Sequence, residues 1–256
     1  MIKIIFFDID GTLLPFGQRY LDSQLIKVLK ILQKKNIKLF IATGRPSFVV
    51  PSFRSIEFDG VLSYNGAYCY NQHEVIYNSP LDRKDIFTLI QTASAMDRPV
   101  GIATRDLLGC NFYSKDLQEF FSIANEELYI IDDYKDKLEE DIYEMMVPVI
   151  EQEEEDLLKN VTTLKCMRWF PKAVDVVSID GGKGKGIEKI LDYYGYTKDE
   201  AMAFGDGGND VDMLTYCGIG IAMGNAMDIA KQASDYITDA VDKNGIIKAL
   251  QHFHLI

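Results

Sequence analysis

Two carboxylates end the first apolar run of the chain. Residues 2–7 favour a β-strand, and the run stops at Asp8 and Asp10, which are followed by Gly11 and Thr12. Such a run predicts a buried strand and its terminating turn, and open α/β sheets bind ligands at the carboxyl ends of their strands. Carboxylates two residues apart can converge on one point, where they repel unless a proton or a cation joins them. The pair fits such a site, and it also fits an ordinary turn.

Polar residues follow two later apolar runs in the same way, and a lone lysine, Lys183, lies in the glycine-rich stretch 181–186. Each element has a structural explanation of its own, but their joint occurrence indicates one site at the edge of a sheet. The residues are Thr43, Gly44 and Arg45 after the run 38–42, and Asp206, Asn209 and Asp210 after the run 201–204.

These groups, in this order, resemble the four motifs of the haloacid dehalogenase-like phosphatases. The motifs are Asp8-x-Asp10-Gly-Thr, Thr43-Gly-Arg45, Lys183-Gly and Gly205-Asp206-x-x-Asn209-Asp210. Two further segments, Asn65-Gly66-Ala67 and Met223-Gly224-Asn225-Ala226, resemble the Cof-type subfamily, IIB. The resemblance spans the whole chain. It implies an α/β fold in which a Rossmann-like core with a parallel sheet carries an inserted α+β cap domain.

The resemblance also implies roles for the aspartates. Asp8 matches the nucleophile that forms an aspartyl phosphate, and Asp10 matches the general acid that then activates water; composition alone does not distinguish the two. Carboxylates at Asp8, Asp10 and Asp206 would repel in a dry pocket, and Mg²⁺ is the hard cation that fits them. In the family, the position of Asp10 binds the metal through its backbone carbonyl. Asp210 is expected as a direct ligand or as the partner of one.

Phosphate binding is assigned to other residues. Thr43, with the adjacent Gly44, matches the family's phosphate-binding hydroxyl, and Lys183 matches its ammonium group. Asn209 is expected to contact phosphate or to orient Asp8. In the family, the cap closes over the site and excludes water. Possible substrate contacts are Arg45 and Asn65 in the core and Arg105, Arg168 and Trp169 in the cap.

Charge and apolar patterning narrow the class of protein. The chain has 256 residues and a net charge of -12, whereas a nucleic-acid binder would carry a basic stripe. An anionic substrate must therefore be attracted by local cations. No apolar run approaches the ~20 residues of a membrane span, and the first run is too short for a signal peptide, so we expect a cytoplasmic protein without membrane contact. The four cysteines are widely spaced, which argues against a zinc site or a disulfide framework.

The pattern of elements predicts two domains, a core of residues 1–80 and 182–256 and an inserted cap of residues 81–181. In the core, strands alternate with helices, which is typical of a mostly parallel sheet. The cap instead mixes helices with antiparallel hairpins. Its expected helices cover 83–96, 115–124 and 151–159, and its expected strands lie near Val100 and Cys110 and over 163–169 and 173–179.

Together these features predict a Mg²⁺-dependent phosphomonoester hydrolase that acts through an aspartyl phosphate on small phosphorylated metabolites, with sugar phosphates favoured. Phosphorylated cofactors and nucleotides come second. A phosphomutase is one alternative, because it shares the Asp-x-Asp chemistry but returns the phosphoryl group to a sugar. A phospho-acceptor signalling protein is another, although an acid at Asp10, the Lys183 motif and the cap exceed what it needs. We expect a monomer or a weak homodimer.

Overall fold

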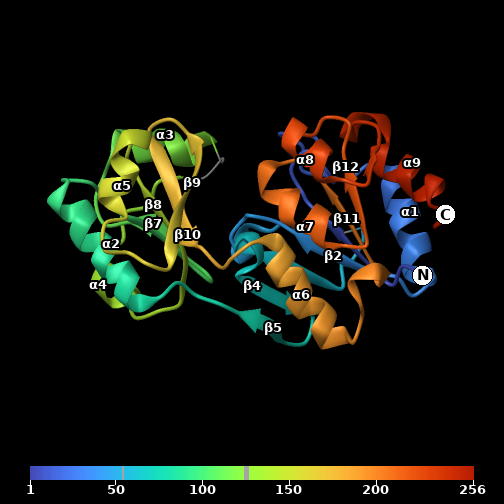
Figure 1. Ribbon diagram of the computed structural model, residues 1–256, viewed down its shortest axis with the longest axis horizontal. Coiled ribbons are helices and arrows are strands. Elements are labelled where there is room, and N and C mark those ends of the chain that lie inside the picture. The colour runs from blue at the N-terminus through green and yellow to red at the C-terminus, as the bar shows by residue number, and fades with distance from the viewer. Residues whose placement is uncertain (54, 124–126) are drawn as a thin grey trace. The chain divides into compact units, whose positions relative to one another are not determined.

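The computed structural model describes residues 1–53, 55–123 and 127–256, which form two compact units (Figure 1). The core unit comprises Met1–Asn78 and Gly182–Ile256, and the cap unit comprises Ser79–Gly181. Ala124, the last residue of the predicted helix 115–124, lies outside the described residues. Among the described residues, no helix combines the length and the apolar character that a membrane span needs.

The core unit is built on an eight-stranded sheet with the order β13-β12-β11-β1-β2-β3-β4-β5. The strands from β13 to β3 are parallel, and β4 and β5 are antiparallel. Their bounds are β1 Ile4–Phe7, β2 Lys38–Ala42, β3 Gly60–Ser63, β4 Tyr68–Asn71, β5 Val75–Asn78, β11 Ala201–Gly205, β12 Ile219–Ala222 and β13 Tyr236–Ile237. The core helices are α1 Ser23–Lys34, α6 Lys183–Tyr194, α7 Val211–Tyr216, α8 Asp228–Ala233 and α9 Gly245–His252.

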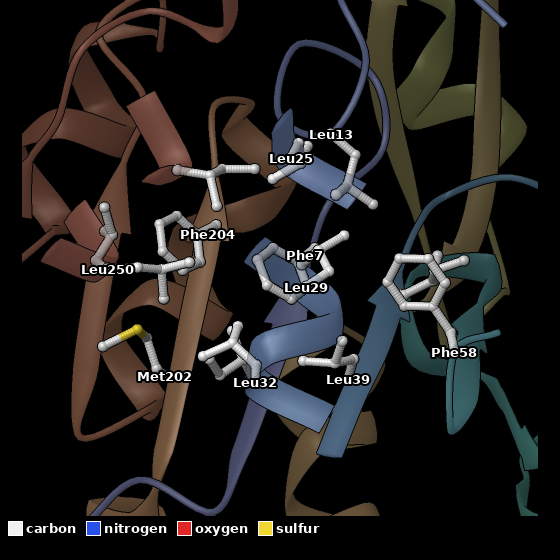
Figure 2. Packing of buried hydrophobic residues seen from close by; sticks show 14 of the residues in the cluster. Phe7, Leu13, Leu25, Leu29, Leu32, Leu39, Phe58, Met202, Phe204 and Leu250 are labelled. Carbon is white, nitrogen blue, oxygen red and sulfur yellow. The ribbon is translucent and has the colours of Figure 1, made fainter. Parts of the chain in front are cut away.

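Helices cover both faces of this sheet, which explains why its central strands are apolar without interruption. Phe7 and its neighbour Phe204 stack with ring centroids 5.2 Å apart, on the face that α1 and α9 cover (Figure 2). On the opposite face, Phe6 belongs to an apolar cluster with residues of α6, α7 and α8. Both faces of the sheet are therefore covered, which leaves the strand ends as places where polar side chains can gather.

The cap unit has its own antiparallel sheet, with the order β7-β6-β8-β10-β9, and its own apolar cluster. Its strands are β6 Gly101–Thr104, β7 Leu108–Cys110, β8 Ile142–Val147, β9 Leu164–Phe170 and β10 Ala173–Ser178. Its helices are α2 Arg83–Ala95, α3 Lys115–Ile123, α4 Tyr134–Lys137 and α5 Glu154–Leu157. A parallel-sheet core with a separate antiparallel α+β unit confirms the expected fold class.

Three details of the cap differ from the sequence-based prediction, and the first is the short helix α4, which was not predicted. The central strand β8 was not predicted, because the acidic residues 139–141 and Glu144 mask its short apolar pattern. The predicted helix 151–159 is a 3-10 turn over Glu151–Glu153 followed by the single helical turn of α5. Like charges spaced three and four residues apart disfavour a longer helix there.

Candidate active site

Three neighbouring strands bring their terminal side chains to one edge of the core sheet. Strand β1 lies between β11 and β2, with Phe7 in register with Phe204 on one side and Ile41 on the other. The chain leaves these strands at Asp8, Asp206 and Thr43, which are 7%, 6% and 2% exposed. Parallel pairing therefore gathers two carboxylates and one hydroxyl that lie far apart in the sequence.

A fully buried lysine joins this group from the first turn of α6. The Nζ atom of Lys183 lies 2.6 Å from Oδ1 of Asp8 and 2.5 Å from Oδ1 of Asp210. Burial alone would lower the pKa of Lys183, but attraction to Asp210 and Asp8 outweighs burial and raises it. The lysine therefore stays charged inside the protein. The neighbouring Lys185 instead pairs with Glu188 at the surface.

Burial disfavours the ionised forms of Asp8 and Asp206. Burial raises the pKa of Asp8 to about 8, although the charge of Lys183 opposes this change. Burial also raises the pKa of Asp206 to about 6, against the hydrogen bond from the Thr12 hydroxyl. The raised pKa values mean that nearby positive charge and hydrogen bonds do not fully offset the cost of burying the ionised carboxylates, so the site favours an added proton or cation.

Asp210 is buried and uses both of its oxygens within the protein. Its Oδ1 pairs with Lys183, while its Oδ2 accepts hydrogen bonds from the backbone N–H groups of Asp206 and Gly207, each at 2.8 Å. Ligand atoms of Asp8, Asp206 and Asp210 lie within 4.8 Å of one another. The three residues form a buried triad that could hold a metal ion, and the contacts of Asp210 suit an orienting role for the loop that carries Asp206.

Arg45 holds Asp10 in a two-point ion pair. Its Nε and Nη2 atoms lie 2.8 Å and 2.7 Å from the two carboxylate oxygens, and both side chains are 37% exposed. The backbone N–H of Arg45 donates to Oγ1 of Thr43 at 3.1 Å, so the hydroxyl proton of Thr43 remains able to donate elsewhere. The arginine that the sequence offers as a substrate contact therefore also fixes the orientation of Asp10.

Asn65 lies beside Thr43 and contacts a second asparagine, Asn209. Nδ2 of Asn209 donates to Oδ1 of Asn65 at 2.9 Å, and the backbone N–H of Asn65 donates to the carbonyl of Thr43 at 3.1 Å. Asn65 has φ 50°, and a Cβ on Gly44 would lie 3.1 Å from its Oδ1. A non-glycine residue in this backbone region is uncommon and is held there by its surroundings. One side of the site is thus formed by residues in mutual contact, namely Asn65, Gly44 and Asn209.

Residues 5–250 match the family of haloacid dehalogenase-like hydrolases, a span that includes every strand-end residue described above. This chain belongs to that family. The resemblance inferred from the motifs is therefore confirmed.

Similar proteins cover almost the whole chain. The Bacillus subtilis (strain 168) protein named "Putative phosphatase YkrA" is 30% identical over 99% of this chain and 98% of its own length. The structure of BT1666 from Bacteroides thetaiotaomicron, a phosphatase of the superfamily, has a TM-score of 0.92 at 31% identity and covers 100% of this chain and 96% of that one. The subclass IIB sugar phosphatase BT4131 has a TM-score of 0.86 at 32% identity, with coverage of 99% and 100%. The chain is thus a haloacid dehalogenase-type phosphatase of subfamily IIB.

Within the cap of this haloacid dehalogenase-like protein, the three candidate contacts differ. Arg168 is engaged in the fold, because its Nε lies 2.6 Å from Glu154 Oε1 and its Nη atoms donate to backbone carbonyls, including that of Val149 at 3.0 Å. The indole N–H of Trp169 donates to Asp175 at 2.6 Å, although the side chain stays half exposed. Arg105 is exposed just beyond β6. Arg168 therefore serves the cap's own structure.

Two residues beside the metal site were not identified from the sequence. The Thr12 hydroxyl donates to Asp206 Oδ1 at 2.8 Å, and Nδ2 of Asn225 donates to the carbonyl of Gly11 at 2.8 Å and lies 3.5 Å from Asp206 Oδ2. Both orient the loops that present carboxylates. Both belong to the motifs quoted above, but a motif does not reveal which partner a side chain meets.

Proposed function

We propose that this phosphatase is a Mg²⁺-dependent phosphomonoester hydrolase in which Asp8 is the nucleophile. The observation that carries the proposal is the buried pair of Asp8 with Lys183, next to the carboxylates of Asp206 and Asp210. The site holds a nucleophile, a fixed positive charge and an adjacent carboxylic acid, Asp10. Those are the groups that phosphoryl transfer to and from an aspartate requires.

The donor set fits a hard divalent cation. All the candidate ligand atoms are carboxylate oxygens, and the lysine compensates only one of the three negative charges. Asp8 and Asp206, with the backbone carbonyl of Asp10, would hold Mg²⁺, and Asp210 would orient them. When bound, the ion would neutralise charge on the nucleophile and on the phosphoryl oxygens.

In the first half of the proposed reaction, a carboxylate oxygen of Asp8 attacks phosphorus in line with the leaving group. The bond between phosphorus and the leaving oxygen breaks, and Asp10 donates its proton to that oxygen, which departs as an alcohol. The hydroxyl of Thr43 and the ammonium group of Lys183 bind the phosphoryl oxygens as their charge changes. Asn209 and Gly44 complete the phosphate-binding wall.

In the second half, water attacks the same phosphorus atom. Asp10, which is now ionised, accepts a proton from the water, and the bond between phosphorus and Asp8 breaks to release inorganic phosphate. Arg45 contributes by pairing with both oxygens of the ionised Asp10, which orients the carboxylate that accepts this proton. Asn65 contributes by accepting a hydrogen bond from Asn209, which orients the Asn209 side chain.

The proposed substrates are small phosphorylated metabolites, and sugar phosphates come first among them. BT4131, a sugar phosphatase, supports this order because it is similar over nearly the full length. Within the cap, Trp169 and Arg105 are the candidates for leaving-group recognition, since Arg168 is committed to Glu154.

A metabolite panel tests this function. The purified protein is incubated with sugar phosphates, nucleotides and phosphorylated cofactors, with Mg²⁺ or with a chelator, and inorganic phosphate is measured. We expect release that requires Mg²⁺ and is greatest for a sugar phosphate. An isomerised sugar phosphate without free phosphate would identify a phosphomutase instead. A stable phosphoprotein without turnover would identify a phospho-acceptor protein.

A further inference from the structure

The helix that presents Lys183 has an intrinsically weak start. Its first four residues are Lys183, Gly184, Lys185 and Gly186, and its N-cap residue is Gly182. Glycine is the poorest helix former after proline, and Gly182 has no side chain that could accept a hydrogen bond from the first turn. The first N–H groups of a helix have no partners within the helix. The first turn of α6, which carries Lys183, therefore needs hydrogen-bond acceptors from elsewhere in the protein.

A residue of the neighbouring helix α7 supplies that support. The Oδ2 atom of Asp212 accepts a hydrogen bond from the backbone N–H of Gly184 at 2.9 Å. The two segments are packed so closely that a Cβ on Gly182 would lie 2.2 Å from Asp212 Oδ2. The glycines that weaken the helix are the residues that allow this approach.

Residues 210–212 contact both the side chain of Lys183 and the backbone of the next residue. Asp210 pairs with its ammonium group, and Asp212, two residues later, binds the backbone N–H of the next residue. We propose that Asp212 is a positioning residue, which caps α6 from the adjacent helix and thereby fixes Lys183 against Asp8. This inference rests on the proposed role of Lys183 in binding the phosphoryl group.

The test compares Asp212→Ala with Asp212→Asn and measures the affinity for vanadate, which stands in for the phosphoryl group. The amide of Asp212→Asn keeps an oxygen acceptor, whereas Asp212→Ala removes the cap. We expect Asp212→Ala to weaken vanadate binding and kcat/KM for p-nitrophenyl phosphate by about fivefold, the factor that a lost helix cap represents. Asp212→Asn should stay within about twofold of the unaltered protein.

A role of Asp212 as a hydrogen-bond acceptor and a role as a mere negative charge predict opposite changes in vanadate affinity. If Asp212 acted only as a negative charge near an anion site, both substitutions would tighten vanadate binding. Weaker binding in Asp212→Ala alone therefore isolates the hydrogen bond. Amide hydrogen exchange provides a second readout, because Gly184 should exchange faster in Asp212→Ala and normally in Asp212→Asn.

Asp22→Ala is the matched control. Asp22 is also exposed and caps α1 through the N–H groups of Gln24 and Leu25, at 2.7 Å and 3.3 Å, but α1 carries none of the site residues. Both alanine variants should lower Tm by a similar amount, about 2–4 °C. Only Asp212→Ala should lose vanadate affinity.

Unchanged or tighter vanadate binding in Asp212→Ala would overturn the inference, as would an equal loss in Asp212→Asn. Asp212→Ser gives the same comparison with a polar side chain too short to reach Gly184, in case Asp212→Ala does not fold. If the unaltered protein bound no vanadate and hydrolysed no phosphate ester, the proposed function itself would be wrong, which is a separate result.

Discussion

At the scale of residues, the described part of the site pairs two basic side chains with a larger number of carboxylates. Lys183 pairs with Asp8 and Asp210, and Arg45 pairs with Asp10, while Asp206 receives only hydrogen bonds from neutral groups. The protein as a whole carries a net charge of -12. Among the described residues of the core, we therefore expect Lys183 to be the main side-chain charge that attracts a phosphate ester, aided by the proposed cation.

Replacing the nucleophile should separate chemistry from folding. Asp8→Asn should abolish turnover, because an amide cannot form the acyl phosphate. The fold should survive, since Lys183 keeps Asp210 as its partner and one repelling carboxylate is removed. Hydrolysis of p-nitrophenyl phosphate and circular dichroism test the two halves of this prediction. Retained hydrolysis would contradict the assignment of Asp8.

The raised carboxyl pKa values predict how stability depends on pH without metal. The pKa of Asp8 is about 8 in the folded chain, whereas an unfolded aspartate has a pKa of about 3.9. The folded form therefore binds more protons, and this group's contribution to stability falls between about pH 4 and pH 8. Asp206, with a pKa of about 6, acts in the same direction up to that pH.

Thermal unfolding in chelator should show this trend. We expect Tm to fall from pH 5 to pH 8 in the unaltered protein and to fall less in Asp8→Asn. Added Mg²⁺ should flatten the profile, because a cation compensates the same carboxylates. Identical profiles for the two proteins in chelator would show that Asp8 is not the group responsible.

The pair of Arg45 with Asp10 predicts a dependence on the leaving group. Arg45→Met should lower kcat/KM for an alkyl phosphate by about tenfold or more, because general-acid catalysis contributes about 10²–10⁴-fold. The loss should be smaller for p-nitrophenyl phosphate, whose leaving group needs little protonation. Vanadate affinity serves as the control. Equal losses for both esters would indicate that Arg45 acts on the phosphate and not through Asp10.

At the scale of elements, the sequence predicts the strand ends better than the contacts made there. The runs ending at Asp8, Thr43 and Asp206 are short, apolar and followed by glycine, so the sheet edge can be recognised from local pattern alone. The two-point pairing of Arg45 with Asp10 cannot be recognised from the local pattern, because it depends on the conformation of the turn after β2. The strand β8 was not predicted for a related reason. Its pairing with β6 and β10 stabilises a strand that the acidic residues beside it would not indicate.

The loop after β3 should be sensitive to a single methyl group. Gly66 has φ +96°, and a Cβ there would lie 2.3 Å from the carbonyl oxygen of Gly182, at the start of α6. Gly66→Ala should cost about 3 kcal/mol or more, the sum of backbone strain and overpacking. It should also lower activity, because α6 carries Lys183.

Gly17→Ala provides the matched comparison. Gly17 has φ +80°, but nothing lies within 4 Å of an added Cβ. Backbone strain alone should cost about 1–2 kcal/mol. Denaturant unfolding of both variants measures the difference, and equal losses would show that the approach of Gly66 to α6 is not close enough to matter.

At the scale of the whole molecule, we expect the chemistry and the recognition of the leaving group to belong to different units. Asp8, Asp10, Thr43, Lys183 and Asp206 all lie in the core unit, while Arg105 and Trp169 lie in the cap unit. Each unit has its own sheet and its own apolar cluster, and the chain passes between them only at residues 78–79 and 181–182. Such units can fold separately in principle.

Removal of the cap tests this division. A core in which a short Gly-Ser linker replaces residues 79–181 should still hydrolyse p-nitrophenyl phosphate slowly, because the nucleophile, the acid and the metal ligands remain. Its kcat/KM values for different sugar phosphates should converge, because the candidate recognition residues Arg105 and Trp169 are then missing. A truncated core that kept the substrate ranking of the full chain would place specificity near Arg45 and Asn65. Circular dichroism and thermal unfolding of the core establish that it is folded before the rankings are compared.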